Sequence, residues 1–235
     1  MHKKRIAIII GGTSDIGYAI IERLIRKYEI IFSYNKNYKK ARSMKNYFAH
    51  HISFFKLDIN SKKEIISFVK KIEKFSDRVD KVIFNSSMLD KRRNFIDIKY
   101  NTVKLMINVN CLGLFFLTQK LVSIFKNKKI IRNLLFISSK ASKTGGYQLS
   151  HYSATKSFMN TFVLSISKEL KAYKIICNTI ILYKVLTKGF MLTSMNDKKK
   201  SKVLIIRSPS EVAKKCETIL NTANLDYSGR DYYLK

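Results

Sequence analysis

Short apolar runs alternate along this chain with longer segments in which apolar residues recur at helical spacing. The runs are rich in Ile and Phe, which is typical of buried β-strands. We expect strands near residues 5–10, 29–34, 52–57, 80–84, 131–137, 175–182 and 231–234. We expect helices near residues 16–27, 38–49, 61–74, 97–126, 151–173 and 209–222. This alternation predicts an α/β fold with a doubly wound, seven-stranded parallel sheet of the Rossmann type.

No linker or internal repeat interrupts the alternation, so we expect a single domain over residues 1–235. One segment breaks the pattern: residues 183–207 lack a clear period and contain the basic run 198–200. We expect a mobile substrate loop there, over the functional site. Ser208 then precedes the only proline, and Glu211 follows three residues later, which predicts a capping box at the start of the last helix.

Composition adds a formal net charge of +30, from 46 Lys and Arg against 16 Asp and Glu. Such a charge is common in proteins that bind nucleic acids. Here the basic residues are spread over nearly every predicted helix, which indicates solvated helix faces rather than one binding stripe. We therefore do not favour a nucleic-acid function.

The residues that could hold a metal show no suitable spacing. Cys111, Cys177 and Cys216 are far apart, and the four histidines have no ligand pattern, so we expect no metal site. His151 is expected to line the pocket or face solvent. The apolar run after the N-terminal basic residues stops at glycines after five residues, too soon for a signal peptide or a membrane span. We therefore expect a cytoplasmic protein with reduced cysteines.

The first predicted strand runs directly into a glycine-rich turn, and a helix follows. Glycines at such a turn let backbone N–H groups and the positive end of the helix approach a phosphate closely. The spacing differs from the G-x-G-x-x-G fingerprint, and a plain tight turn would use the same residue types. The position at the end of the first strand favours a nucleotide site, formed by Gly11, Thr13, Ser14, Asp15, Ile16 and Gly17.

A candidate acid lies after the fifth predicted strand. Tyr152 and Lys156 are four residues apart at the start of a predicted helix, so both side chains project from one face. An ammonium group beside a tyrosine favours the phenolate, lowers the pKa of the phenol and prepares it to donate a proton to a carbonyl oxygen. Ser139 lies shortly before this pair and completes a candidate site.

The spacing alone does not single out this site. Ser87, Tyr100 and Lys104 repeat the same intervals after the fourth predicted strand. In a chain so rich in lysine, several such tyrosine–lysine pairs arise by chance. Only the surroundings of the two sets can separate them.

Several motifs, spread over the whole chain, resemble those of the short-chain dehydrogenase/reductase family. The glycine turn is similar to the family's G-x-x-x-G-x-G, with Asp15 in place of the middle glycine. Asp58, followed by Ile59, matches the family acid that bonds the adenine. Asn85 begins Asn-Ser-Ser-Met where the family has N-N-A-G. Arg207–Ala213 looks like the family segment R-x-x-P-x-E-V-A, shortened by one residue.

The resemblance also decides between the two serine–tyrosine–lysine sets, because the family site follows the fifth strand, downstream of the N-x-x-G motif that Asn110 begins. It implies that Ser139 bonds the substrate carbonyl and that Tyr152 protonates it. Lys156 would depress the tyrosine pKa and hold the nicotinamide ribose. Asn110 would order a water that returns the proton through Lys156. Tyr100 and Lys104 are then a chance pair on the surface. Gly145 and Gly146, between Ser139 and Tyr152, let the chain turn over a bound substrate.

The cofactor implied is NADP(H) in preference to NAD(H). The second predicted strand ends without the carboxylate that an NAD enzyme places at the ribose 2′-hydroxyl, and Lys36, Lys39 and Lys40 follow it. Thr187 matches the family threonine that touches the carboxamide, although Leu182-Tyr183 replaces the usual Pro-Gly before it. The cofactor set implied by the resemblance is Gly11, Thr13, Ser14, Asp15, Ile16, Gly17, Tyr34, Asn35, Lys36, Asp58, Ile59, Asn85, Tyr152, Lys156, Val185 and Thr187.

For the substrate, the resemblance is strongest to the beta-ketoacyl-[acyl-carrier-protein] reductases of fatty-acid synthesis. Carrier proteins are acidic, so the basic stretch 126–132, together with Lys168, Lys171 and Lys174, would suit such a partner near the site entrance. Reductases of sugars, steroids or pterins share the same motifs and stay open as alternatives. A catalytically idle nucleotide-binding or interaction protein is a further alternative. The family also implies a homo-oligomer, a dimer or a tetramer.

Overall fold

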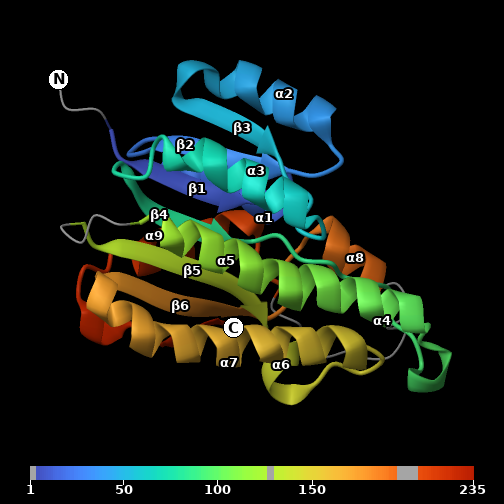
Figure 1. The fold of residues 1–235 in the computed structure, drawn as a ribbon. Helices are drawn as coiled ribbons and strands as arrows, with labels where there is room; N and C mark the ends of the chain where they lie inside the picture. The colour runs from blue at the N-terminus through green and yellow to red at the C-terminus, as the bar shows by residue number, and fades with distance from the viewer. Residues whose placement is uncertain (1–3, 126–129, 195–205) are drawn as a thin grey trace.

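The computed structural model describes residues 4–125, 130–194 and 206–235. Its centre is a seven-stranded sheet in the order β3-β2-β1-β4-β5-β6-β7, and every neighbouring pair is parallel (Figure 1). The strands are β1 (Ile6–Ile10), β2 (Glu29–Tyr34), β3 (Ile52–Lys56), β4 (Val79–Phe84), β5 (Arg132–Ser139), β6 (Ile175–Leu182) and β7 (Asp231–Leu234). Each lies within two residues of its predicted position, which confirms the doubly wound fold.

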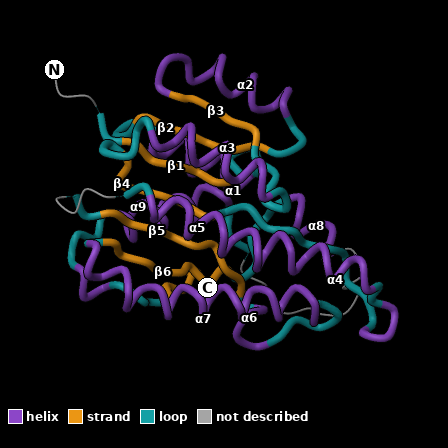
Figure 2. Tube along the Cα trace, viewed as in Figure 1, coloured by secondary structure: helices purple, strands orange, loops and turns teal. Residues whose placement is uncertain are grey.

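Helices cover both faces of the sheet (Figures 1 and 2). One face is packed by α1 (Asp15–Leu24), α2 (Tyr38–Phe48) and α9 (Pro209–Leu220). The other is packed by α3 (Lys62–Glu73), α5 (Leu114–Ser123) and α7 (Ser150–Leu170), while α4 (Tyr100–Ile107) packs against α7. Because helices bury both faces, the central strands carry apolar residues at nearly every position, which explains the continuous apolar runs in the sequence.

The start of α9 is capped as the sequence predicts. The Ser208 hydroxyl accepts a hydrogen bond from the Glu211 N–H, and the Glu211 carboxylate accepts one from the Ser208 N–H. Pro209 occupies the first helical position, where a missing N–H costs nothing. The capping box is therefore confirmed.

Two short helices were not expected, α6 (Ala141–Thr144) and α8 (Lys188–Ser194). The prediction of a loop over residues 183–207 is wrong for 188–194. There the Thr187 carbonyl and hydroxyl accept hydrogen bonds from the N–H groups of Met191 and Phe190 and begin a helix. Val185 also forms a parallel bridge with Arg207. The basic run 198–200 lies outside the described residues.

The helices α4 and α5 form one run, Tyr100–Ser123, joined by a π-helical turn over Asn108–Gly113. A Cβ atom at Gly113 would lie 2.2 Å from the Ile59 carbonyl oxygen, so a larger residue there would push the helix away from the end of β3. Among the described residues, this run is the one helix long and apolar enough to cross a membrane, with a mean hydropathy of 1.5. It packs against α3 and α7, and the central helix of a globular core passes the same test.

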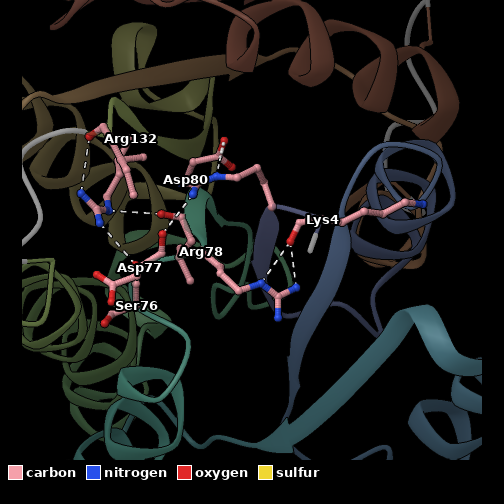
Figure 3. A network of polar contacts seen from close by, with 9 residues as sticks. Lys4, Ser76, Asp77, Arg78, Asp80 and Arg132 are labelled. Atoms are coloured by element: carbon pink, nitrogen blue, oxygen red, sulfur yellow. Dashed lines mark hydrogen bonds and ion pairs between the residues drawn. The ribbon is translucent and has the colours of Figure 1, made fainter. Parts of the chain in front are cut away.

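The amino edge of the sheet encloses Arg132, which is fully buried at the start of β5. Its guanidinium donates hydrogen bonds to the main-chain oxygens of Val79 and Ser76, at 3.1 and 3.3 Å (Figure 3). The guanidinium carbon also lies 4.9 Å from the centroid of the Phe125 ring. Arg132 therefore joins the beginnings of β4 and β5 from inside the protein.

Candidate active site

A cavity of about 930 Å³ opens at the carboxyl edge of the sheet, opposite Arg132. Its walls come from the segments that follow β1, β2, β4, β5 and β6, together with the first residues of α7 and α8. Chain connections leave β1 and β4 towards opposite sides of the sheet, and a crevice at that switch point is the usual ligand site of such folds. The cavity is thus where the topology places a ligand.

The predicted serine, tyrosine and lysine meet at this cavity. Ser139 ends β5, whereas Tyr152 and Lys156 occupy the first two turns of α7. The Ser139 hydroxyl acts on the Tyr152 hydroxyl and favours its charged form. The Lys156 Nζ donates to the Ile137 carbonyl oxygen at 2.8 Å and lies 5.8 Å from the centroid of the Tyr152 ring. The structure therefore brings these three residues together.

Burial shifts the ionisation of both Tyr152 and Lys156. The Tyr152 ring is partly exposed to the cavity, but its hydroxyl lies deep, and burial raises the pKa of Tyr152 to about 12. Burial lowers the pKa of Lys156 to about 7. The pKa of Tyr152 in the protein alone thus lies above its ordinary value, and not below it as expected from Lys156, because desolvation outweighs the opposing effect of the Ser139 and Ser87 hydroxyls.

A hydroxyl that the sequence reading placed elsewhere also reaches this site. Ser87, assigned above to the coincidental set, lines the cavity and, like Ser139, favours the charged form of Tyr152. Its supposed partner Tyr100 is 76% exposed at the start of α4, as expected of a surface residue. The sequence signal for Ser87 was its place at the end of β4, beside the cavity.

Asn110 lies behind the cavity instead of lining it, and is 2% exposed in the π-helical turn. Its side-chain oxygen accepts from the Met88 N–H at 2.7 Å. Its amide nitrogen donates to the Met88 carbonyl and the Thr155 hydroxyl, at 2.9 and 3.1 Å. Asn110 thus ties the segment after β4 to α7, and both of its amide hydrogens are engaged in doing so.

The predicted cofactor residues fall into two groups. Those that line the cavity are Thr13, Ser14, Asp15, Ile16, Asn85, Tyr152, Lys156, Val185 and Thr187. Those that do not are Gly11, Gly17, Tyr34, Asn35, Lys36, Asp58 and Ile59. Gly11 and Gly17 shape the turn: Gly11 has a φ of +86°, and a Cβ atom on Gly17 would lie 2.4 Å from the Gly11 carbonyl oxygen.

The remaining members of the second group lie at the ends of β2 and β3. The Tyr34 ring packs against Phe54, with centroids 5.6 Å apart, and Asn35 and Lys36 are exposed beyond it. The Asp58 carboxylate accepts from the Asn60 N–H at 2.9 Å. Beyond β2, the cavity is lined instead by Asn37 and Lys40.

Asp15, which stands where the family has a glycine, connects the first turn to α8. Its carboxylate accepts from the Lys188 N–H at 3.0 Å and lies 4.0 Å from the Lys40 Nζ. The Asn85 amide donates to the Gly11 carbonyl and to the Ser14 hydroxyl, at 2.9 and 2.8 Å. These bonds fix the turn that follows β1.

His151 neither lines the cavity nor faces solvent, contrary to the prediction. It is 6% exposed, and its Nε2 lies 3.9 Å from the Asp90 carboxylate. Burial lowers the pKa of His151. Because it is next to Tyr152 on a helix, its side chain projects in another direction, into the contact with the segment after β4.

The basic patch predicted at the site entrance lies elsewhere. Arg132 is buried at the amino edge of the sheet, and residues 126–129 lie outside the described residues. Lys168 lies in the last turn of α7, remote from Tyr152, and Lys171 and Lys174 follow that turn. The basic residues that do line the cavity, beside Lys156, are Lys40, Arg92, Lys140, Lys184, Lys188 and Lys235.

Comparison with known proteins assigns the family. The model of the short chain dehydrogenases matches residues 5–203. L-rhamnose 1-dehydrogenase (NADP(+)) of Thermoplasma acidophilum is 29% identical over 201 residues, which are 83% of this chain and 75% of that protein. A 3-oxoacyl-[acyl-carrier-protein] reductase of Haemophilus influenzae is 23% identical over 193 residues, 82% of this chain and 76% of that protein.

Solved structures show the same fold. The 3-ketoacyl-(acyl-carrier-protein) reductase from Brucella melitensis, complexed with NADH, gives a TM-score of 0.89 at 18% identity and covers 99% of this chain and 97% of its own. ElxO with NADP bound gives a TM-score of 0.85 at 20% identity, with 98% and 96% covered. Because the family model spans most of the sequence, this chain belongs to the short-chain dehydrogenase family.

Proposed function

We propose that this protein is an NADP(H)-dependent oxidoreductase that reduces a ketone to an alcohol, with Tyr152 as the proton donor. The observation that carries the proposal is the meeting of Ser139, Tyr152 and Lys156 at one end of a large cavity. A phenol, a neighbouring hydroxyl and a buried ammonium group form a set that can polarise and protonate a carbonyl oxygen.

Each residue has a distinct part in this proposal. The Ser139 hydroxyl donates a hydrogen bond to the substrate carbonyl and orients it. Tyr152, with its pKa raised by burial, keeps its proton at neutral pH and so enters the reduction as the acid. Lys156 stabilises the phenolate that remains, and Asn110 holds the segment after β4 in place. The nicotinamide cofactor supplies the hydride when bound.

The residues around the first turn fit such a cofactor. A cofactor pyrophosphate would meet Thr13, Ser14 and Ile16 at the start of α1, where N–H groups and the helix dipole favour an anion. The carboxylate of Asp15 would repel the phosphates, but it is held by Lys188 and lies near Lys40. The absence of a carboxylate at the end of β2 and the presence of Lys40 in the cavity wall support NADP(H) over NAD(H).

For the substrate we favour a 3-oxoacyl group carried by an acyl carrier protein. The cavity has apolar walls that suit an acyl chain, provided by Leu89, Leu149, Leu182 and Phe190. The basic rim residues Lys140 and Lys184 suit an acidic carrier and replace the patch expected from the sequence. A sugar substrate, as in the rhamnose dehydrogenase, would have to use the polar part of the same wall, such as Arg92 and Thr144.

The test is oxidation of NADPH by the purified protein against acetoacetyl carrier protein, acetoacetyl-CoA, a free sugar and a simple ketone. We expect fastest turnover with the carrier-bound substrate. Charge reversal at both Lys140 and Lys184 should raise the KM for that substrate and spare acetoacetyl-CoA, with the difference fading at high salt. Tight NADPH binding with no turnover of any substrate would instead support the idle nucleotide-binding protein.

The proposal includes a homo-oligomer that covers an apolar surface of α4, α5 and α7. Leu112 is 62% exposed, Phe115 46% and Phe158 39%, and the ring of Phe162 lies between the two phenylalanines. Two copies paired through this surface would bury these side chains. Analytical sedimentation should therefore show a dimer or a larger oligomer, and Leu112→Asp should shift the equilibrium towards the monomer.

The three buried free cysteines are in keeping with a reducing compartment such as the cytoplasm.

A further inference from the structure

The helix α8 begins between two of the segments that enclose the cavity. On one side, the Lys188 N–H donates to the Asp15 carboxylate at 3.0 Å and so joins α8 to the turn after β1. On the other side, α8 lies beside the segment after β4, because a Cβ atom added to Gly189 would be 3.3 Å from the Leu89 Cδ2 atom. These four residues all line the cavity. The start of α8 therefore bridges the crevice at the switch point of the sheet.

The chain that leads into α8 is fixed separately. Val185 forms a parallel bridge with Arg207. The Leu186 N–H donates to the Arg207 carbonyl, and the Arg207 N–H donates to the Lys184 carbonyl, both at 2.9 Å. These contacts hold residues 184–186, whereas the bond to Asp15 holds the first residue of α8. The Asp15 bond is thus the contact that joins the helix itself to the turn after β1.

An acidic residue in the first turn of a helix also has an ordinary role, because it interacts favourably with the helix dipole. Asp15 is the first residue of α1, so its charge contributes in this way. At this place, however, the same charge repels the phosphates of the proposed cofactor, and the Lys40 Nζ lies 4.0 Å away. The helix-dipole role alone would therefore be filled at a cost to cofactor binding. The bond to α8 gives the carboxylate a second role.

Resting on the proposed function, we propose that Asp15 is a positioning residue, whose carboxylate fastens α8 across the crevice and slows the release of the bound cofactor. Thr187 and Phe190, on either side of the fastened residue, line the cavity, so a movement of α8 away from the turn would open the cavity wall. A cofactor that leaves through the opened wall dissociates at a rate that follows the fraction of molecules with α8 released. Loss of one hydrogen bond raises that fraction several-fold.

The first measurement is amide hydrogen exchange in the cofactor-free protein, which reports the opening of α8 without turnover. The reporter is the Met191 N–H, which donates to the Thr187 carbonyl within α8. Asp15→Ala and Asp15→Asn both remove the charge from the first turn of α1, but only asparagine keeps an oxygen that can accept from α8. We expect exchange to be about fivefold faster in Asp15→Ala and less than about twofold faster in Asp15→Asn.

The donor side of the bond offers a matched pair of changes. Lys188→Pro removes the N–H, and proline is tolerated at the first position of a helix. Lys188→Ala removes the side chain and keeps the N–H. Exchange at Met191 should therefore rise in Lys188→Pro as it does in Asp15→Ala and stay as in the parent protein in Lys188→Ala. Adding Asp15→Ala to Lys188→Pro should cause no further increase, because the bond is already lost.

The second measurement is the rate at which NADPH dissociates, followed by the loss of its fluorescence when excess NADP⁺ displaces it. Both Asp15 variants lose the repulsion of the phosphates, so the difference between them reports the bond alone. We expect dissociation to be about fivefold faster from Asp15→Ala than from Asp15→Asn.

Equal exchange in the two Asp15 variants would overturn the proposal, as would equal rates of NADPH dissociation from them. If the protein did not bind NADPH at all while the exchange rates still separated as expected, the proposed function would fail. The contact between Asp15 and α8 would then stand without a role in holding a cofactor.

Discussion

The two edges of the sheet each hold a buried cation, and the two are used differently. At the amino edge, the Arg132 guanidinium is surrounded by main-chain oxygens and by the Phe125 ring. At the carboxyl edge, Lys156 has the Ile137 carbonyl on one side and the cavity with Tyr152 on the other. A buried charge enclosed by acceptors stabilises a fold, whereas one that keeps an open side is available to a ligand.

The groups around each cation follow the same division. Near Arg132 the charges are paired, as between Arg5 and Asp80, and burial raises the pKa of that aspartate. The cavity wall instead combines several lysines with Asp15 as its carboxylate. We therefore expect changes at the amino edge to alter stability, and changes at the carboxyl edge to alter binding and turnover. The following predictions test that separation.

The largest effect is expected from Tyr152→Phe. The change removes the proton donor and little apolar contact, so kcat should fall about a thousandfold. Affinity for NADPH, measured by cofactor fluorescence, should change less than about threefold. Tyr100→Phe, the matched change in the exposed set, should leave kcat unaltered. If Tyr100→Phe lowered kcat instead, the active site would lie after β4, and Lys156 would have no catalytic role to contrast with Arg132.

At the other edge, Arg132→Met should act on stability alone. The methionine fills a similar space but leaves the carbonyls of Ser76 and Val79 without their donor. Unsatisfied buried groups cost free energy, so the free energy of unfolding in urea should fall by about 3 kcal/mol. The affinity for NADPH and the KM of any substrate should stay as they are. A selective rise in the KM for a carrier-bound substrate would show that the amino edge also takes part in binding.

The pKa of Lys156 predicts how stability depends on pH. Its folded pKa is about 7 and its ordinary value is 10.5, so between these values the unfolded chain binds more protons than the folded one. Stability from this group therefore rises with pH through that window, and the cost of burying the charge is felt in full below it. Compared with Lys156→Met, the parent protein should gain about 2 kcal/mol between pH 7 and about pH 9.

Urea unfolding of both proteins across that range gives the measurement. The difference between the two removes the opposing contributions of other buried groups, such as Cys177 and Cys216, whose pKa values are raised by burial. Parallel curves would mean that Lys156 titrates as it does in water. In that case the pKa of Lys156 would be that of an ordinary exposed lysine. The difference between Lys156 and Arg132 would then lie only in the groups that each contacts.

The sequence predicted what repeats with a period and missed what depends on packing. All seven strands and the long helices follow from runs of apolar residues, and the capping box of α9 follows from local hydrogen bonding. The helix α8 was missed because its start combines bonds to Thr187 with a bond from the Lys188 N–H to Asp15, which is far away in the chain. Arg132 was mistaken for a surface residue because a buried arginine needs acceptors from other segments.

The candidate site shows the same division. Ser139, Tyr152 and Lys156 were found from spacing and resemblance, but Ser87 was assigned to Tyr100 because sequence distance was used in place of proximity. The sequence also could not distinguish between Lys36, Lys39 and Lys40 after β2, because nothing in it says which of these side chains points towards the cavity. Of these, Lys40 is the one in the cavity wall.

Lys40→Ala should therefore weaken NADPH binding more than NADH binding. Lys40 lies in the first turn of α2, and its Nζ lies 4.0 Å from Asp15 and 5.9 Å from the centroid of the Tyr18 ring. Removing one partly exposed charge from a phosphate contact should raise the Kd for NADPH about fivefold and change that for NADH less than twofold. Lys39→Ala is the matched control, because Lys39 precedes it on the same helix, is exposed and does not line the cavity. Cofactor fluorescence titrations at fixed salt give both constants. If Lys39→Ala weakened NADPH binding as much as Lys40→Ala, the effect would come from the loss of any positive charge. If Lys40→Ala weakened NADPH and NADH binding equally, Lys40 would not contact the 2′-phosphate.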